Sequence, residues 1–137
     1  MVLSKVEIAE RTLEVFARSG VPDVEELLGW LTEDVELRSA IVGGASGSTY
    51  HGHDGVRQWA REVDEAFDEL RMLPHEFSEV GDLVVALGHV QARGGASGLV
   101  LDVAIGWVVS VRNGKAATLH GYLDHAEALA AARAGSN

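Results

Sequence analysis

Apolar residues recur at helical spacing through the first 31 residues of the chain. One face of the first predicted helix consists of Val6, Ala9, Leu13, Phe16 and Ala17. This interval is typical of a helix that packs one face against a core. Ser4 and Glu7 have the pattern of a capping box, and Ser19-Gly20 is a stop signal. Pro22 and Asp23 begin a second, shorter helix. Its apolar residues are Leu27, Leu28 and Leu31.

A longer amphipathic segment follows a glycine-rich loop at Val42–Ser48. Its apolar face consists of Val56, Trp59, Ala60, Val63, Phe67 and Leu70. Its other face consists of Arg61, Glu62, Asp64, Glu65, Asp68 and Glu69. Such a division predicts a helix with one face on the core and one in solvent. We therefore predict a third helix from Val56 to Leu70, with Asp54 as its N-cap.

The rest of the chain has the pattern of β-strands, followed by a short Ala-rich helix. The predicted strands are Val35–Ser39, Leu73–Val80, Asp82–Ala92, Leu99–Val111 and Ala116–Leu123. Gly94–Gly98 and Asn113-Gly114 indicate hairpin connections, since Asn and Gly tolerate positive φ. Asp124 and Glu127 have the capping-box spacing at the last helix. Strands that cluster after helices predict an α+β fold, with a mostly antiparallel sheet.

Composition and charge limit the classes of function. The chain has 137 residues, which we interpret as a single domain over 1–137. Its net charge of −10 disfavours nucleic acid and anionic membranes as partners. No apolar run reaches the roughly 20 residues that span a bilayer, and the N-terminal segment carries acids where a signal peptide is continuously apolar. We therefore expect a cytoplasmic protein.

Four segments in order carry a resemblance to a known family. They are Leu31–Leu37, Tyr50–Val56, Ala66–Arg71, and the closing stretch Arg112–Lys115 with Tyr122–Asp124 and Glu127–Leu129. Together they resemble the nuclear-transport-factor-2-like superfamily, and within it the SnoaL-like polyketide cyclase group. The resemblance implies a cystatin-like cone, in which a bent sheet wraps around three helices and leaves a deep apolar pocket. It also implies a homodimer through the convex sheet face, and a hydrophobic small-molecule ligand without a cofactor.

Strand alternation predicts which side chains face this pocket. On the long strand the inward set is Leu101, Val103, Ile105, Trp107 and Val109. On the preceding strand the match to the family places Leu83, Val85, Leu87, His89 and Gln91 inward. The inward sets of the last and first strands are Leu119, Gly121 and Leu123, and Val35, Leu37 and Ser39.

The catalytic acids of known relatives are replaced in this chain. The ketosteroid isomerases have a general-base Asp where Ser39 stands, and an oxyanion-stabilising Asp where Trp107 stands. The epoxide hydrolases have Arg-x-Asp where this chain has His89-x-Gln91, and a second Asp at Gly121. The resemblance therefore disfavours both of these chemistries as such.

His89 is the candidate general base, because desolvation in an apolar pocket lowers the pKa of a histidine and keeps it neutral. Gln91 is the candidate donor to a carbonyl oxygen, and Ser39 is expected to orient oxygens. The alternative is that His89 is a structural histidine satisfied by a neighbour. The expected ligand-binding residues are Leu37, Trp59, Leu87 and Trp107, with Tyr50 or His53 at the rim. The tryptophans are equally compatible with a simple core role.

Other polar residues have simpler interpretations. His51 and His53 lack a convincing third ligand nearby, so no metal is expected. His120, Tyr122 and Asp124 share the convex side, where interface or structural roles are favoured. Asp102 is expected to meet Arg112 or a dimer partner.

Three functions remain open from the sequence. The first is a cofactor-free acid–base enzyme of isomerase, dehydratase or cyclase type that acts on a hydrophobic oxygenated molecule. The second is a non-catalytic binding protein for an apolar small molecule. The third is a dimeric interaction module with a vestigial pocket.

Overall fold

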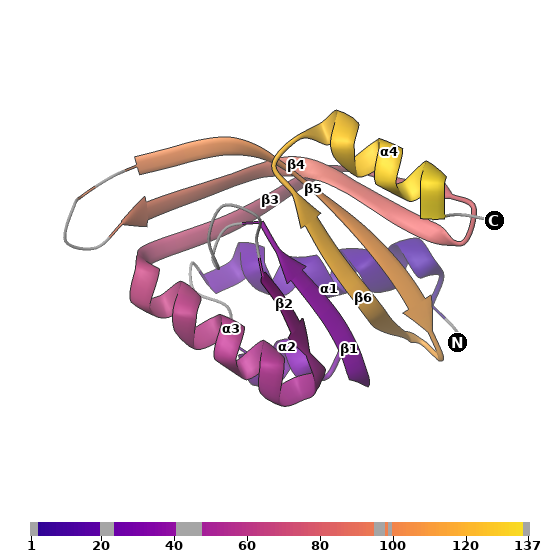
Figure 1. The fold of residues 1–137 in the computed structure, drawn as a ribbon, viewed down its shortest axis with the longest axis horizontal. Helices are drawn as coiled ribbons and strands as arrows, with labels where there is room; N and C mark the ends of the chain where they lie inside the picture. The colour runs from indigo at the N-terminus through magenta and orange to yellow at the C-terminus, as the bar shows by residue number, and fades with distance from the viewer. Residues whose placement is uncertain (1–2, 20–23, 41–47, 95–97, 99, 136–137) are drawn as a thin grey trace.

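The computed structural model describes residues 3–19, 24–40, 48–94, 98 and 100–135 (Figure 1). Its helices are α1 (Lys5–Ser19), α2 (Val24–Leu28), α3 (Gly52–Ala66) and α4 (His125–Gly135). Its strands are β1 (Leu31–Ser39), β2 (Ser48–His51), β3 (Phe67–Val80), β4 (Leu83–Gly94), β5 (Val100–Arg112) and β6 (Lys115–Tyr122). The predicted glycine-rich loop at Val42–Ser48 lies outside the described residues, apart from Ser48, which belongs to β2.

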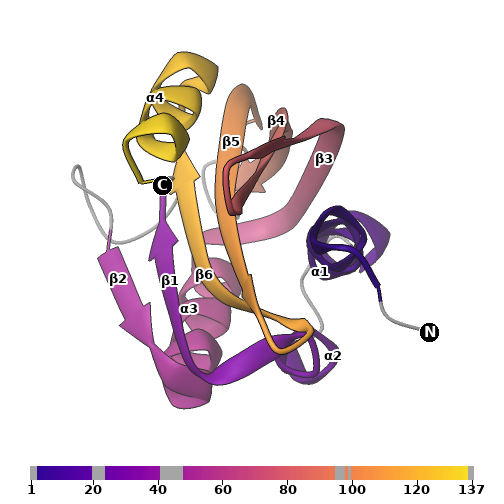
Figure 2. The same ribbon diagram turned by 90° about the vertical axis from the view of Figure 1, so that its right-hand side faces the viewer.

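The strands of the described chain form one open, bent sheet in the order β2-β1-β6-β5-β4-β3. β1 and β6 run parallel, and every other neighbouring pair is antiparallel. This arrangement confirms the predicted α+β class. Figure 2 shows α1 and α4 on opposite sides of the sheet.

Each face of the sheet has its own apolar core. We call the face covered by α1, α2 and α3 the concave face, and the face covered by α4 the convex face. The concave core contains the large buried side chains, among them Leu13, Leu31, Trp59, Met72 and Trp107. The convex core is small and consists of Val85, Val108, Ala128 and Ala132. The two cores share no buried side chain, because the sheet separates them.

Local signals in the sequence predicted several element ends correctly. The Ser4 N–H donates to Glu7 Oε1, and the Glu7 N–H donates to Ser4 Oγ, each over 3.1 Å, so the capping box is confirmed. Asn113 and Gly114 have φ values of 54° and 78°, as the predicted hairpin turn requires. Asp124 Oδ1 accepts the N–H of Ala126 at 2.7 Å, which confirms the cap of α4.

The end of the third helix was predicted too late. α3 ends at Ala66, and the chain continues as a strand from Phe67. Leu70 and Met72 are buried on the concave face as alternate residues of β3. The pairing of β3 with β4 over most of their length outweighs the weak helical preference of this stretch.

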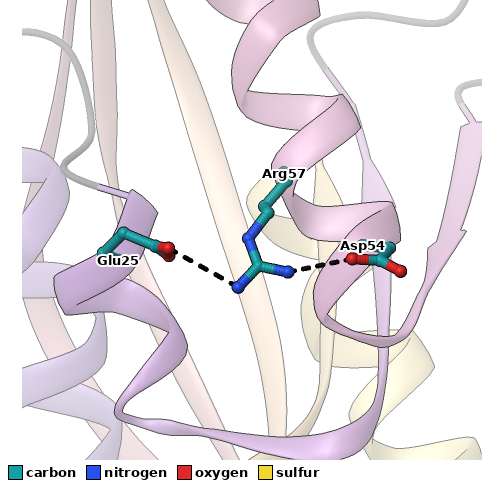
Figure 3. Close-up of polar contacts among 3 residues, drawn as sticks. All are labelled: Glu25, Asp54 and Arg57. Atoms are coloured by element: carbon teal, nitrogen blue, oxygen red, sulfur yellow. Dashed lines mark hydrogen bonds and ion pairs between the residues drawn. The ribbon is translucent and has the colours of Figure 1, made fainter.

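Two further boundaries differ from the prediction. β1 begins at Leu31 rather than Val35, and the strand β2 was not predicted. Asp54 does not cap α3, because His51 holds the N-cap position. Asp54 instead binds Arg57 at 2.9 Å, and the same guanidinium reaches Glu25 of α2 at 3.5 Å (Figure 3). Arg57 thus bridges α2 and α3 at the surface.

Candidate functional site

Along the long strand β5, inward-facing and outward-facing side chains alternate as predicted. Ile105, Trp107 and Val109 are buried in the concave core, whereas Val108 belongs to the convex core. Val103 shares the concave side through its pairing with Val90, but it is 36% exposed. The concave face is therefore covered near Trp107 and open to solvent near Val103.

On β4, the residues that face the concave core are the alternate set to the one predicted. Trp107 pairs with Ala86, and Ile105 pairs with Gly88, so the even-numbered residues of β4 face the concave core. The predicted inward set, Leu83, Val85, Leu87, His89 and Gln91, lies on the convex face. The inward placement of His89 and Gln91 is therefore wrong. Both faces of the first half of β4 are covered, so its apolar residues do not specify the register. In the second half, exposed His89, Gln91 and Arg93 alternate with buried Val90 and Ala92, and this alternation is the sequence signal that could have placed His89 outside.

The remaining predicted pocket residues divide between the two faces. Leu37 and Ser39 are buried on the concave side, as predicted, together with Leu119. Leu123 is exposed beyond the end of β6, so its predicted inward position is wrong. Leu87 packs against the convex core and not against Trp59 or Trp107.

Two hydrogen bonds of the concave core involve its tryptophans. The indole N–H of Trp59 donates to Ser39 Oγ over 3.1 Å. The indole N–H of Trp107 donates to the sulfur of Met72, also over 3.1 Å. Gly121 makes room for the Trp107 ring, since a Cβ there would lie 3.0 Å from Cζ3. Sequence reasoning missed Met72, although its alternation with Leu70 was a strand signal.

His89 belongs instead to a polar cluster on the convex face. Its Nδ1 lies 3.3 Å from Asp102 Oδ1, and the Gln91 amide donates to Asp102 Oδ2 over 3.3 Å. The His89 ring is also 5.5 Å from the His75 ring and 6.3 Å from the His125 ring. His89 is thus satisfied by neighbours on the surface. Asp102 meets His89 and Gln91 rather than Arg112, which was one of its two predicted partners, and its contact with a dimer partner stays a prediction.

Tyr50 is buried, and its hydroxyl donates to Glu62 of α3. Glu62 is therefore an exception in the charged face that was predicted to be in solvent. Both residues line an open groove of about 560 Å³ between β2 and α3. A second hollow, of about 360 Å³, lies on the convex face and includes Gln91 and Asp102. Neither hollow includes the indoles of the concave core.

The histidines and acids elsewhere on the sheet form local contacts. His120 Nε2 lies 2.7 Å from Glu36 Oε2, and Tyr122 lies under the Arg38 guanidinium at 5.6 Å. His53 Nε2 lies 3.3 Å from the Leu31 carbonyl oxygen. In the part of the chain that the structure describes, no group of three or more His, Cys, Asp or Glu could hold a metal ion.

One carboxyl has a shifted pKa. The nearby Thr32 hydroxyl, followed by the Arg112 guanidinium, lowers the pKa of Asp34 below its ordinary value. Arg112 and Asp34 form an ion pair between β5 and β1 at the surface. Both side chains are more than half exposed, so the pair lies outside the buried core.

Comparison with known proteins identifies the family. The model of the SnoaL-like domain matches residues 9–119, and the chain belongs to this family. A nuclear-transport-factor-2-like protein of unknown function from Burkholderia pseudomallei is 30% identical, with a TM-score of 0.73 over 90% of this chain and 93% of that one. No curated protein matches the chain.

Two further solved structures are similar. TerC, co-crystallised with polyporic acid, is 26% identical, with a TM-score of 0.72 over 89% of this chain and 92% of that one. A protein with a ketosteroid isomerase-like fold from Catenulispora acidiphila, in complex with trimethylamine, is 14% identical. Its TM-score is 0.73 over 98% of this chain and 96% of that one, and it bears on the fold alone. None of the helices in the described part of this chain has the length and apolar character that a membrane crossing requires.

Proposed function

We propose that the protein binds a neutral, hydrophobic molecule with a carbonyl oxygen in the concave core. There it promotes cofactor-free isomerisation, dehydration or cyclisation beside that carbonyl. One observation carries the proposal: Ser39 and the indole N–H groups of Trp59 and Trp107 are buried in the same apolar core. Sites for small molecules commonly combine such an apolar lining with a few polar groups.

The charges of the interior support a neutral ligand. Among the described residues, the buried side chains with polar atoms are those of Thr12, Ser39, Tyr50, Trp59 and Trp107. A buried carboxylate or ammonium on a ligand would find no counter-ion there, and burying an unpaired charge is strongly unfavourable. A carbonyl oxygen would accept a hydrogen bond from an indole or a hydroxyl instead.

The same donors would favour acid–base chemistry beside the carbonyl. Donors aimed at the oxygen stabilise the negative charge that develops there when a neighbouring C–H passes its proton to a water molecule. Water takes this role because the described residues of the concave core include no buried carboxylate or imidazole. Ser39 keeps its proposed role of orienting oxygens. His89 and Gln91 have no part in this proposal, because they lie on the convex face. TerC, which was co-crystallised with polyporic acid, adds support as a relative with a small-molecule ligand.

A fluorescence titration tests the proposal. The probes are 2-acetylnaphthalene and 2-propionylnaphthalene, with 2-naphthoate and 2-naphthylmethylamine as charged controls. The neutral probes should change the emission of Trp59 and Trp107, and the S39A variant should weaken their binding. W30F is the control, since Trp30 lies outside this group. Mass spectrometry of each probe after incubation then tests turnover. Binding without any product across a wider panel would favour a non-catalytic binding protein.

A second candidate function rests on how well the interior is filled. Trp107 is 2% exposed and Met72 1%, so the side chains themselves occupy the space near the donors. This observation favours a dimeric interaction module with a vestigial pocket. The polar cluster of His89, Gln91 and Asp102, with the exposed Val100 beside it, would then contact a second copy on the convex face.

Sedimentation of two matched variants tests the dimer. V100E alters the convex face of β5, and V103E alters the concave face of the same strand. If the convex face forms the dimer, V100E should dissociate it and V103E should leave it intact. A wild-type monomer at high concentration, or equal effects of both variants, would contradict this candidate.

A further inference from the structure

Met72 is placed so that it controls the hydrogen bond of Trp107. It lies in β3 on the concave face and is 1% exposed. Its sulfur accepts the Trp107 indole N–H over 3.1 Å. A thioether is a weak acceptor compared with a carbonyl or hydroxyl oxygen. The N–H of Trp107 therefore has a partner that a better acceptor could replace.

The two members of this contact differ in how firmly they are held. The Trp107 ring lies directly over Gly121, and its strand is paired on both sides, with Ala86 and with Gly121. Met72 is unbranched, with three rotatable side-chain bonds, and its thioether adapts to irregular spaces. A rearrangement at this contact would thus move the methionine and leave the indole in place.

The concave face is open to solvent in the same cross-strand row. Met72 pairs with Val90, and Val90 pairs with Val103 on the next strand. Val103 is 36% exposed, whereas Met72 and Val90 are buried. Strands lie about 4.8 Å apart, so Met72 is only about 10 Å along the sheet from the exposed Val103. A ligand that enters over β5 would have only the buried Val90 to pass before it contacts Met72.

We infer that Met72 is a displaceable plug that determines ligand specificity. This inference rests on the proposed function. A ligand carbonyl oxygen takes the place of the sulfur on the Trp107 N–H, and the Met72 side chain rotates away to make room. The site thereby selects a neutral molecule with an acceptor oxygen over a hydrocarbon of the same shape. The movement of Met72 also explains why the proposed binding site is filled by side chains when no ligand is bound.

The test follows the indole N–H signals in ¹H–¹⁵N spectra. Single Trp→Phe variants assign the signals of Trp30, Trp59 and Trp107. The probes are 2-acetylnaphthalene and 2-isopropylnaphthalene, which have similar shapes but differ in the carbonyl. In the wild type, the ketone should shift the Trp107 N–H signal downfield, because an oxygen replaces sulfur. The hydrocarbon should leave that signal in place.

Three variants separate the plug from a general loosening of the core. M72A should bind the ketone about tenfold more tightly, since no side chain has to be displaced. L70A removes a side chain that is equally buried two residues earlier on the same face, and should bind like the wild type. M72L keeps the volume and removes the sulfur. It should move the Trp107 signal without any ligand and leave the Trp59 signal unchanged.

The outcomes distinguish the two proposals. Equal tightening in M72A and L70A, or ketone binding that leaves the Trp107 signal unmoved, would overturn the plug and leave the proposed function standing. An unmoved Trp107 signal in ligand-free M72L would overturn the plug even if M72A fails to fold. Failure of both the wild type and a folded M72A to bind the ketone would overturn the proposed function and the plug with it.

Discussion

The two faces of the sheet use the same strands for different purposes. On the concave face, Trp59 of α3, Trp107 of β5 and Met72 of β3 belong to one buried core, and their polar atoms pair within it. On the convex face, α4 covers only a small alanine-rich core, and His89 and Asp102 lie beside it in contact with solvent. A polar atom in the first setting has few competing partners, whereas one in the second competes with water. This difference is the reason why we propose the site on the concave face.

The largest expected change in the free energy of unfolding comes from truncating a residue of the concave core, compared with a residue of the convex face. Trp107→Ala should lower the free energy of unfolding by about 3–5 kcal/mol, because it leaves a large cavity in the concave core. His89→Ala should change it by less than about 0.5 kcal/mol, because His89 is half exposed and its contacts are at the surface. Urea denaturation measures both. If His89→Ala lowered the free energy of unfolding nearly as much as Trp107→Ala, the stated difference between the two faces would be contradicted.

A smaller change in the free energy of unfolding is expected for substitutions where α4 packs on the sheet. A Cβ at Gly106 would lie 2.6 Å from the Ala128 Cβ, so Gly106→Ala should cost about 1–3 kcal/mol by overpacking. Adding Ala128→Gly removes the opposing methyl group. The double variant should then be more stable than the sum of the two single effects predicts. Strictly additive effects in thermal denaturation would show that α4 does not pack on Gly106.

The cap of α4 should have an effect of about 1 kcal/mol. Asp124→Ala removes the acceptor for the Ala126 and Glu127 N–H groups, which lie 2.7 and 3.2 Å from it. Because α4 buries little else than Ala128 and Ala132, the loss should appear as local opening of this helix. Amide exchange measures it, with Ser4→Ala at the cap of α1 as control. Faster exchange in α1 or in the concave strands of the Asp124→Ala variant would contradict local opening.

The smallest expected effect depends on pH. The Thr32 hydroxyl and Arg112 lower the pKa of Asp34, so its charged form is stabilised in the folded state. Its contribution to stability is therefore present at neutral pH and is lost as the pH falls below about 4 and through the lowered pKa. Asp34→Asn should lower the Tm slightly at pH 7 and not at all in strong acid. A difference in Tm that grows toward acid would have the opposite sign and contradict this assignment.

The candidate site was only partly predictable from sequence. Ser39, Leu37, Trp59 and Trp107 were predicted to face the interior, and the structure places them there. His89 and Gln91 were predicted inward and lie outside. The first half of β4 is apolar on both faces and fits either register, whereas the polar residues of the second half alternate with buried Val90 and Ala92 and indicate the observed one. The contact between Met72 and Trp107 joins β3 to β5 across 35 positions of sequence, and no local pattern reports such a contact.

The sequence by itself determined those features of the fold that depend on residues close together in the chain. The capping box at Ser4, the turn at Asn113-Gly114, the cap at Asp124 and the parity of β5 all follow from contacts within a few positions. Tertiary structure decided the end of α3, the strand β2 and the orientation of the first half of β4, which is apolar on both faces. Each of these depends on pairing with a distant strand, where burial and cross-strand hydrogen bonds outweigh local preference. The same long-range pairing brought Met72 to Trp107 and sent His89 to the opposite face.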